Sequence, residues 1–341
     1  MGKRSRRARL RIVPKDMTSQ YEMSGSIPAV SVLLPVLNGE RWIAESLESL
    51  RHQTFKDFEI LIIDDGCTDS SISIAQSLGL TSLRIVEGPQ QGLGAALALG
   101  VSLALSPYVA RQDQDDLSDP RRLEKQMAYM DTHPNCIIVG SWARLIDEQG
   151  TKMGMLKLPK KNKSIKLALN INSPFVHPSV LFRREAVLRA GNYRTSATEL
   201  LAEDYDLWSR MTSLGDLHNI QEPLVSYRKN PKGITGTQGR AVSRSGCKIA
   251  ILTTEATLGE RLSDSDRQLF SFFFSRHRKI SLAETRHLYR IILQLLLRSG
   301  VPPALRGITW RVWLAPLVWT VRAPRESTPL LDIVEVPETE V

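Results

Sequence analysis

Two carboxylates, Asp64 and Asp65, stand side by side directly after the apolar run Ile60–Ile63. An apolar, β-branched run that stops at acids and a glycine is typical of a buried parallel strand that ends at a ligand crevice. Adjacent carboxylates repel each other, so a physical reason is needed for two of them to stand together. A divalent metal, hydrogen bonds to a ligand and a solvated turn all remain open, since Asp-Gly pairs are common in turns.

A second acidic group follows the short run Tyr108–Ala110, where Arg111 leads into a D-x-D spacing formed by Asp113 and Asp115. Carboxylates are hard oxygen ligands, which suit Mg²⁺ or Mn²⁺ ions that hold phosphate oxygens. A solvated acidic turn is the alternative, and a single D-x-D is a weak signal. Two acidic groups, each at the end of a predicted strand, are much less expected by chance than one alone, which favours a metal site.

A third acidic group, Glu203 and Asp204, opens a predicted helix. Acids in a first turn stabilise a helix by ~0.3–1 kcal/mol through its dipole, and the same dipole is expected to keep Asp204 ionised at neutral pH. The alternative is a general base that takes a proton from an attacking hydroxyl. His177 could contact a ligand, although a lone histidine before an apolar strand is more often structural.

The glycines Gly92 and Gly94 follow a predicted strand, as the glycines of a dinucleotide-binding site do. Leu97 fills the third small position of that motif, and no acid stands ~20 residues further on in a strand-end context. We therefore exclude an NAD site and expect these glycines to allow close packing of a helix on a strand.

Strand and helix patterns alternate from Val30 onward, which predicts a parallel sheet covered by helices on both faces. Asp119 is expected to cap a helix that begins at Pro120, and another helix begins near Glu203. Beyond about Pro231 the strand signal disappears and the pattern is helical. The predicted strands are Val30–Leu34, Glu59–Ile63, Leu83–Val86, Tyr108–Ala110, Ile137–Val139 and Val180–Phe182, and one late helix has Leu288, Ile291, Ile292, Leu295 and Leu296 on one face.

The composition, with 42% hydrophobic and 24% charged residues, is that of a globular protein. The net charge of +9 suits anionic membranes, nucleic acid or phosphorylated substrates equally well. Three widely spaced cysteines make neither a disulfide framework nor a metal cluster, which fits a reducing cytoplasm. No run reaches the ~18 apolar residues that span a bilayer, and no secretory signal is apparent. We expect a cytoplasmic protein, soluble or at the inner face of the cell membrane.

Two terminal segments differ from the rest of the chain. Residues 1–28 are basic and without periodicity, so we expect a flexible tail. Near the other end, Arg306–Arg322 combines flanking arginines with Trp310, Trp313 and Trp319 around an uncharged stretch too short to cross a bilayer. This pattern predicts a segment that lies at the membrane interface. The alternative is ordinary packing against the rest of the protein.

Taken together, the motifs resemble those of family 2 glycosyltransferases with the GT-A fold. The resemblance implies an α/β fold, with a GT-A-type, Rossmann-like sheet that binds a nucleotide-sugar and a C-terminal helical extension. It implies a catalytic domain at 29–235 and a helical region at 236–341. The matching segments, in order, are Ser31–Gly39, Ser49–Phe55, Phe58–Asp69, Ala110–Asp116, His177–Val180, Ala202–Trp208 and Tyr227–Arg228.

The resemblance also implies roles for individual residues, by their positions in these motifs. Around the donor, Pro35 and Asn38 would shape the loop over the base and ribose, Asp64 and Asp65 would contact the uracil or ribose, and Arg111 would join them. Asp113 and Asp115 would hold the ribose and a diphosphate-bound metal, Mg²⁺ or Mn²⁺. Asp204 would be the base and Glu203 its supporting neighbour, while His177, Arg228 and Lys229 could contact the acceptor or diphosphate.

One departure from the family pattern affects the metal site. The family often has a metal-binding His after the Tyr-Arg pair, whereas Lys229 and Asn230 follow it here. The metal would then be held more weakly, or Lys229 would offset phosphate charge. Cys67 stands where the family usually has Ser, which we interpret as a harmless replacement.

The function implied is that of an inverting glycosyltransferase. Its donor would be a nucleotide-sugar, expected to be a UDP-sugar, and its acceptor a hydroxyl of a glycan or a lipid-linked molecule, in cell-surface polysaccharide synthesis. The alternative from another class is a catalytically silent module that binds nucleotide-sugars. A nucleic-acid-binding protein is disfavoured, because the sequence lacks a basic face with interleaved aromatics.

Overall fold

The computed structural model describes residues 27–195, 201–275 and 282–298. The basic tail predicted at 1–28 falls almost entirely outside these residues, and so does the predicted interfacial segment Arg306–Arg322. No helix among the described residues combines the length and the apolar character needed to cross a membrane.

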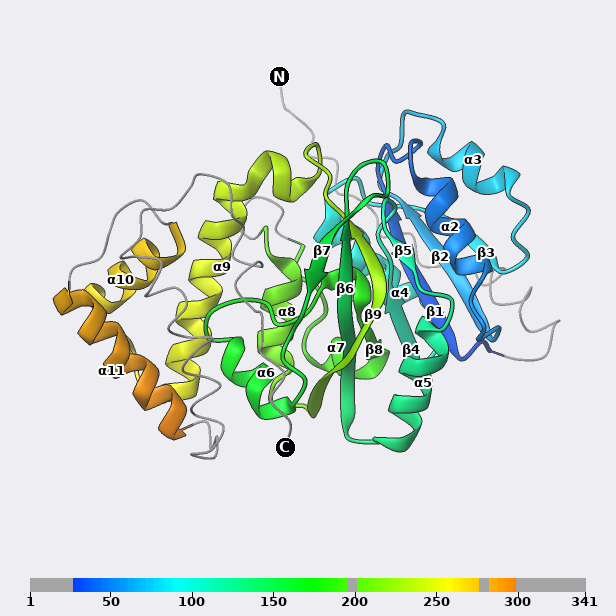
Figure 1. The fold of residues 1–341 in the computed structure, drawn as a ribbon. Coiled ribbons are helices and arrows are strands. Elements are labelled where there is room, and N and C mark those ends of the chain that lie inside the picture. Colours follow the sequence, from blue (N-terminus) through cyan, green and yellow to red (C-terminus); the bar gives the residue numbers. More distant parts are fainter. Residues whose placement is uncertain (1–26, 196–200, 276–281, 299–341) are drawn as a thin grey trace, which may run out of the picture.

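A single sheet of nine strands forms the centre of the described structure (Figure 1). Its strands are β1 (Val30–Val36), β2 (Phe58–Asp64), β3 (Leu83–Glu87), β4 (Tyr108–Arg111), β5 (Leu117–Ser118), β6 (Cys136–Ile146), β7 (Lys152–Leu156), β8 (Leu181–Arg183) and β9 (Asp216–Arg228). They lie in the order β3-β2-β1-β4-β8-β6-β9-β5, and β7 pairs with β6 outside this path.

The first four strands pair in parallel, as predicted from their apolar runs. β1 continues through Pro35, which is in register with Ile63, so the strand is longer than expected. β8 runs antiparallel to β4 and β6, while β9 runs parallel to β6 and antiparallel to β5. The sequence interpretation found β8 and part of β6 but not β5, β7 or β9.

Helices cover both faces of the sheet, as predicted. They are α2 (Ile43–Arg51), α3 (Ser71–Ser77), α4 (Leu93–Leu103), α5 (Arg122–Thr132), α6 (Asn162–Ala168), α7 (Arg184–Arg189), α8 (Glu203–Met211), α9 (Ile234–Leu258), α10 (Asp264–Ser275) and α11 (Leu282–Arg298), with the 3₁₀ turn η1 (His177–Ser179). Alternate strand residues point to opposite faces. Val32 and Leu34 therefore pack with α2, α3 and α5, whereas Leu33 packs in the core that includes α4 and α8.

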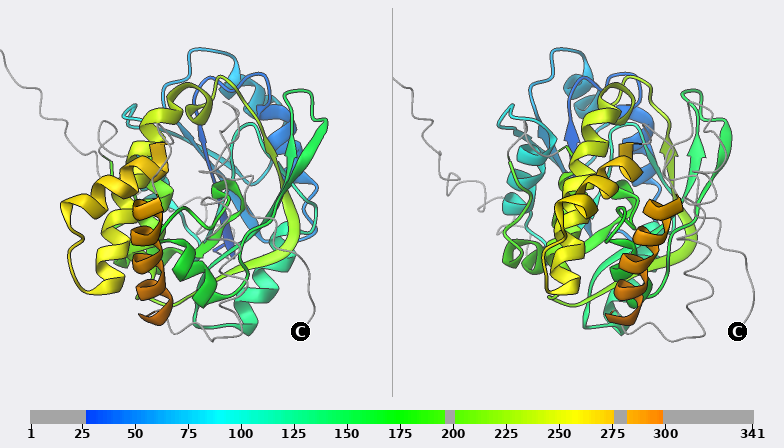
Figure 2. Two further views of the ribbon diagram at one scale, coloured as in Figure 1. Left: turned by 60° about the vertical axis from the view of Figure 1, so that its left-hand side comes forward. Right: turned by 90° about the vertical axis from the view of Figure 1, so that its left-hand side faces the viewer.

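The last three helices share the core on the α4 side of the sheet. Ile249 and Leu258 of α9 belong to this core together with Leu288 and Leu295 of α11, the latter two on the face predicted to be apolar. Figure 2 shows α9, α10 and α11 together on one side of the molecule. The side chain of Leu296, predicted for the same face of α11, lies outside the described set.

The helix start predicted at Asp119 and Pro120 is wrong by two residues. α5 begins at Arg122, and no side chain caps its first turn. The backbone N–H of Asp119 instead donates to Leu224 O of β9 at 2.9 Å, and its carboxylate accepts the N–H of Arg121 at 3.1 Å. Asp119 is thus held at the edge of the sheet and shapes the turn before the helix.

Candidate active site

A cleft of about 1810 Å³ opens beside the carboxyl ends of β1, β2 and β4. Parallel strands that end at one edge of a sheet bring residues from distant parts of the chain together there. Most of the predicted site residues line this cleft, whereas Asp64 and Lys229 do not. Those that line it are Pro35, Asn38, Asp65, Arg111, Asp113, Asp115, His177, Glu203, Asp204 and Arg228.

The adjacent acids Asp64 and Asp65 have different roles. One carboxylate oxygen of Asp64 accepts the backbone N–H groups of Gly66 and Cys67 at 3.1 and 2.8 Å, which closes the turn after β2. Asp65 lines the cleft and accepts the N–H groups of Gln90 and Gly92 at 2.7 and 3.1 Å. The Asp64 carboxylate thus organises the turn and lies outside the cleft lining, and its expected donor contact stays a prediction.

The wall formed by the loop after β1 contains Pro35 and Asn38. Asn38 has a φ of 50°, in the left-handed region that asparagine tolerates better than most residues. Its side-chain oxygen accepts the N–H of Thr68 at 2.8 Å. This bond ties the loops after β1 and β2 together at the cleft.

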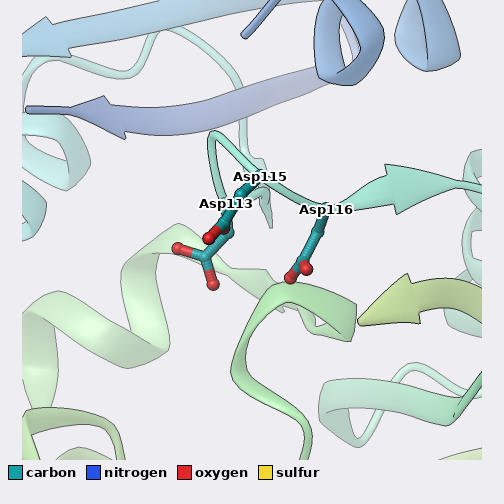
Figure 3. A group of neighbouring side chains, drawn as sticks. All are labelled: Asp113, Asp115 and Asp116. Carbon is teal, nitrogen blue, oxygen red and sulfur yellow. The ribbon is translucent and has the colours of Figure 1, made fainter. Parts of the chain in front are cut away.

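The turn after β4 presents three carboxylates, Asp113, Asp115 and Asp116, whose side chains lie close together in Figure 3. One oxygen from each lies within 4.8 Å of the others. Asp113 forms an ion pair with the fully buried Arg111. Asp115 accepts an N–H of the Asn230 amide at 3.0 Å.

This turn is electrostatically suited to a divalent cation. Burial, together with the negative charge of Asp113, raises the pKa of Asp115 and raises that of Asp116 further. One oxygen of Asp116 accepts the N–H of Arg228 at 2.7 Å, while its other oxygen is buried and has no hydrogen-bond partner among the described residues. A hard cation would offset the charge of all three groups, so these residues fit the predicted metal.

Arg228 holds the acidic turn in place. Its guanidinium donates to Asp115 O and Glu148 O at 2.8 and 3.0 Å and to the Glu45 carboxylate at 2.8 Å. These protein acceptors occupy it, which favours a positioning role over the expected contact with acceptor or diphosphate. Lys229 points elsewhere, with its ammonium 5.7 Å from the Tyr227 ring centroid.

Sequence interpretation did not single out several residues that support the turn. Arg122, fully buried, donates to Arg111 O at 2.6 Å and to the Gln112 side chain at 2.9 Å. Burial lowers the pKa of Arg122 to about 9. Lys232 was also missed, and it lines the cleft on the loop that leads into α9. Nothing local in the sequence distinguishes these residues from ordinary surface cations.

The first turn of α8, where Glu203 and Asp204 lie, forms another part of the cleft wall. The Ser173 hydroxyl donates to Asp204 at 3.4 Å. Burial raises the pKa of Asp204, so burial outweighs the helix dipole, which we expected to keep this group ionised. Burial and the charge of Asp204 raise the pKa of Glu203 to about 7. The positive charge of the buried Arg111 opposes these two upward shifts, because it favours the ionised form of both carboxyl groups.

His177 lies between this wall and the aromatic core. Its Nε2 is 3.0 Å from the Tyr193 hydroxyl, and its Nδ1 is 3.9 Å from a Glu203 carboxylate oxygen. Burial and the nearby Arg111 charge lower the pKa of His177 well below its ordinary value. The imidazole is therefore neutral at physiological pH, and it can exchange hydrogen bonds without adding charge to the cleft.

Comparison with known proteins identifies the class. Residues 31–191 match glycosyl transferase family 2. The putative glycosyltransferase EpsE of Bacillus subtilis is 35% identical over 208 residues, which cover 60% of this chain and 74% of EpsE. A β-1,3-galactosyltransferase of Escherichia coli that uses UDP-Gal and α-D-GlcNAc-diphosphoundecaprenol is 31% identical, over 69% of this chain and 84% of the relative. The chain belongs to glycosyl transferase family 2.

Solved structures show the same fold. The first 349 residues of Staphylococcus aureus TarS, in complex with UDP-GlcNAc, superpose with a TM-score of 0.57 at 18% identity, covering 86% of this chain and 87% of the other. The mannosyltransferase PcManGT of Pyrobaculum calidifontis, with GDP-Man and Mn²⁺ bound, gives a TM-score of 0.51 at 18% identity, covering 87% and 84%. The predictions of a GT-A fold and of an inverting glycosyltransferase are confirmed.

Proposed function

We propose that this cleft transfers a sugar from a nucleoside diphosphate to a hydroxyl of a lipid-linked glycan, in the assembly of a cell-surface polysaccharide. The observation that carries the proposal is the meeting of two acidic walls in one cleft. Asp113 and Asp115 come from the turn after β4 and Asp204 from the first turn of α8, and all three line the cleft. Direct displacement needs a site for the leaving diphosphate and a base for the incoming hydroxyl, and the two walls supply one each.

The diphosphate side would be held through a divalent metal, which neutralises the negative charge that develops on the leaving group. Asp113 and Asp115 would hold this ion, and the partnerless oxygen of Asp116 supports a charge-neutralising group at the same turn. The ligands offered by this turn are hard oxygen atoms, which suit both Mg²⁺ and Mn²⁺ and therefore do not select between the two ions. The Asn230 amide donates an N–H to Asp115, and its oxygen accepts the N–H of Lys232 at 3.0 Å, so Asn230 supports the turn.

The acceptor side would be served by Asp204. A hydroxyl is a poor nucleophile until its proton is removed, and a carboxylate on the wall facing the metal turn can accept that proton. Ser173 would orient Asp204, and Glu203 would tune its charge. The raised pKa of Asp204 makes it a stronger base than an exposed aspartate once it is ionised.

The acceptor class comes from the chemistry named for a relative. The galactosyltransferase of Escherichia coli extends a sugar attached to undecaprenol through a diphosphate. A lipid-linked acceptor of this kind would place the enzyme at the inner face of the cell membrane. The donor base and sugar stay open, and a UDP-sugar remains our expectation.

A donor panel with a defined acceptor tests the proposed function. The full chain would be incubated with UDP-, GDP- and dTDP-sugars, Mn²⁺, and GlcNAc-diphosphoundecaprenol or a short-chain analogue, and released nucleoside diphosphate would be measured. We expect turnover with one donor class, and loss of turnover in EDTA. Donors that raise the melting temperature but are never turned over with this acceptor would instead support the silent binding module.

A further inference from the structure

The outer side of α9 carries a regular row of cations. Arg240, Arg244 and Lys248 follow each other at four-residue spacing and are all exposed, and Leu252 continues the row with 60% of its surface exposed. Residues four apart lie on one side of a helix, so these four form a single stripe about 18 Å long. The cleft-lining residues of this helix, such as Gly239 and Gly246, lie on its other side.

This row has no counter-charge within the described structure. No Asp or Glu occurs from residue 229 to 254, and none of the three cations has an ion-pair partner among the described residues. Like charges at four-residue spacing destabilise a helix. A solvated helix face normally mixes both signs of charge, so the absence of acids here points to an anionic partner outside the chain.

The outer side of α11 repeats the pattern. Arg286 and Arg290 are exposed and are followed on the same side by Leu293 and Leu297, with 48% and 57% of their surfaces exposed. The opposite side of α11, with Leu288 and Leu295, packs into the core. Each helix thus presents two or more cations, followed by exposed leucine toward its carboxyl end.

α9 and α11 themselves lie on the same side of the molecule, where both face the viewer in the right-hand view of Figure 2. The ends of both helices also meet, because Arg298 is 3.9 Å from Glu260. We name the residues Arg240, Arg244, Lys248, Leu252, Arg286, Arg290, Leu293 and Leu297 the basic face.

We propose that the basic face binds the surface of an anionic lipid bilayer. Cations attract anionic headgroups, and leucines beside them can enter the boundary between headgroups and acyl chains. The chain continues directly from α11 into the sequence that holds Trp310, Trp313 and Trp319 among arginines, which is the composition of an interfacial segment. The usefulness of this contact rests on the proposed lipid-linked acceptor, because docking beside α9 would bring that acceptor toward the cleft.

Vesicle co-sedimentation of the full chain tests the basic face. The variant Arg240→Gln/Arg244→Gln/Lys248→Gln would be compared with a control, Lys56→Gln/Lys152→Gln/Arg189→Gln, which removes the same charge from exposed positions on other elements. Vesicles would contain phosphatidylcholine with phosphatidylglycerol, or phosphatidylcholine alone. Each cation at an anionic surface contributes about fivefold to binding, so the loss of three should weaken binding of the α9 variant by roughly a hundredfold.

The expected result is a specific loss: the α9 variant loses binding to anionic vesicles, the control keeps it, and raised salt weakens the wild type through screening. Leu293→Ser/Leu297→Ser should weaken binding that remains in high salt. Equal losses in the α9 variant and the control would show a general charge effect and overturn the proposal, as would unchanged binding in both. Donor turnover with a short-chain acceptor in solution should be unaltered in every variant, so loss of vesicle binding is separable from failure of the proposed function.

Discussion

Asp115→Asn should lower the rate of sugar transfer by about 10²–10³-fold, the size of effect seen when a group that stabilises developing negative charge is removed. The substitution takes one negative charge from the acidic turn but keeps an oxygen that can accept the N–H of Asn230. Asp113→Asn should have a similar effect on the rate, but it also removes the partner of Arg111. Asp115→Asn is therefore the cleaner of the two.

Thermal melting separates this metal role from a structural one. Without metal, burial beside Asp113 disfavours the charged form of Asp115, so Asp115→Asn should be at least as stable as the wild type. With Mn²⁺ and a nucleoside diphosphate, the wild type should gain in melting temperature and the variant should not, because ligands stabilise only the state that binds them. Asp57→Asn, an exposed position remote from the cleft, is the matched control. An equal Mn²⁺-dependent gain in the variant would contradict the assignment.

Asp204→Asn should abolish most transfer, by about 10²–10⁴-fold, while the dissociation constant for the donor stays near that of the wild type. The reason is that only the proton acceptor is lost, and the amide can still accept the weak bond from Ser173. Glu203→Gln should reduce the rate less, since Glu203 acts on Asp204 rather than on the acceptor. Single-turnover rates and donor titrations would measure the two quantities separately.

The pH dependence gives an independent check on Asp204. A base must be deprotonated to act, and burial raises the pKa of Asp204 above its ordinary value. Activity of the wild type should therefore rise with pH through a limb that lies above the ordinary range of an aspartate. Asp204→Asn should lose this limb in whatever activity remains. A variant that transfers at the normal rate but binds donor poorly would show that Asp204 serves binding.

Much of the fold could be predicted because the parallel strands are buried on both faces and appear as continuous apolar runs. β9 could not be found in this way, since Asp216–Arg228 mixes polar residues with Pro223 and is only partly buried along its length. Its place depends on pairing with β6 and β5, whose partner residues lie about 80 and about 110 positions earlier in the chain. Such long-range pairing leaves little trace in a local pattern.

The candidate site, like the fold, could be predicted where the signal is local and could not where it depends on long-range contacts. The acidic motifs could be identified because each is a short segment at the end of one strand or the start of one helix. Asp64 and Asp65 were given one role, but the Asp64 carboxylate turns back to the N–H groups of Gly66 and Cys67, so of the two only Asp65 lines the cleft. The positioning roles of Arg228 and Arg122 depend on carbonyl groups from distant segments, which no local motif indicates.

The stereochemistry of transfer tests the central claim most directly, because it reports on both walls of the cleft at once. Proton NMR would determine the anomeric configuration of the glycosidic bond that the wild type forms from an α-linked nucleotide-sugar. With the leaving diphosphate at Asp113 and Asp115 and the hydroxyl activated by Asp204 from the other side, a single displacement should give the β configuration. An α product would exclude a single in-line displacement and would contradict the account of Asp204 as the base for the incoming hydroxyl.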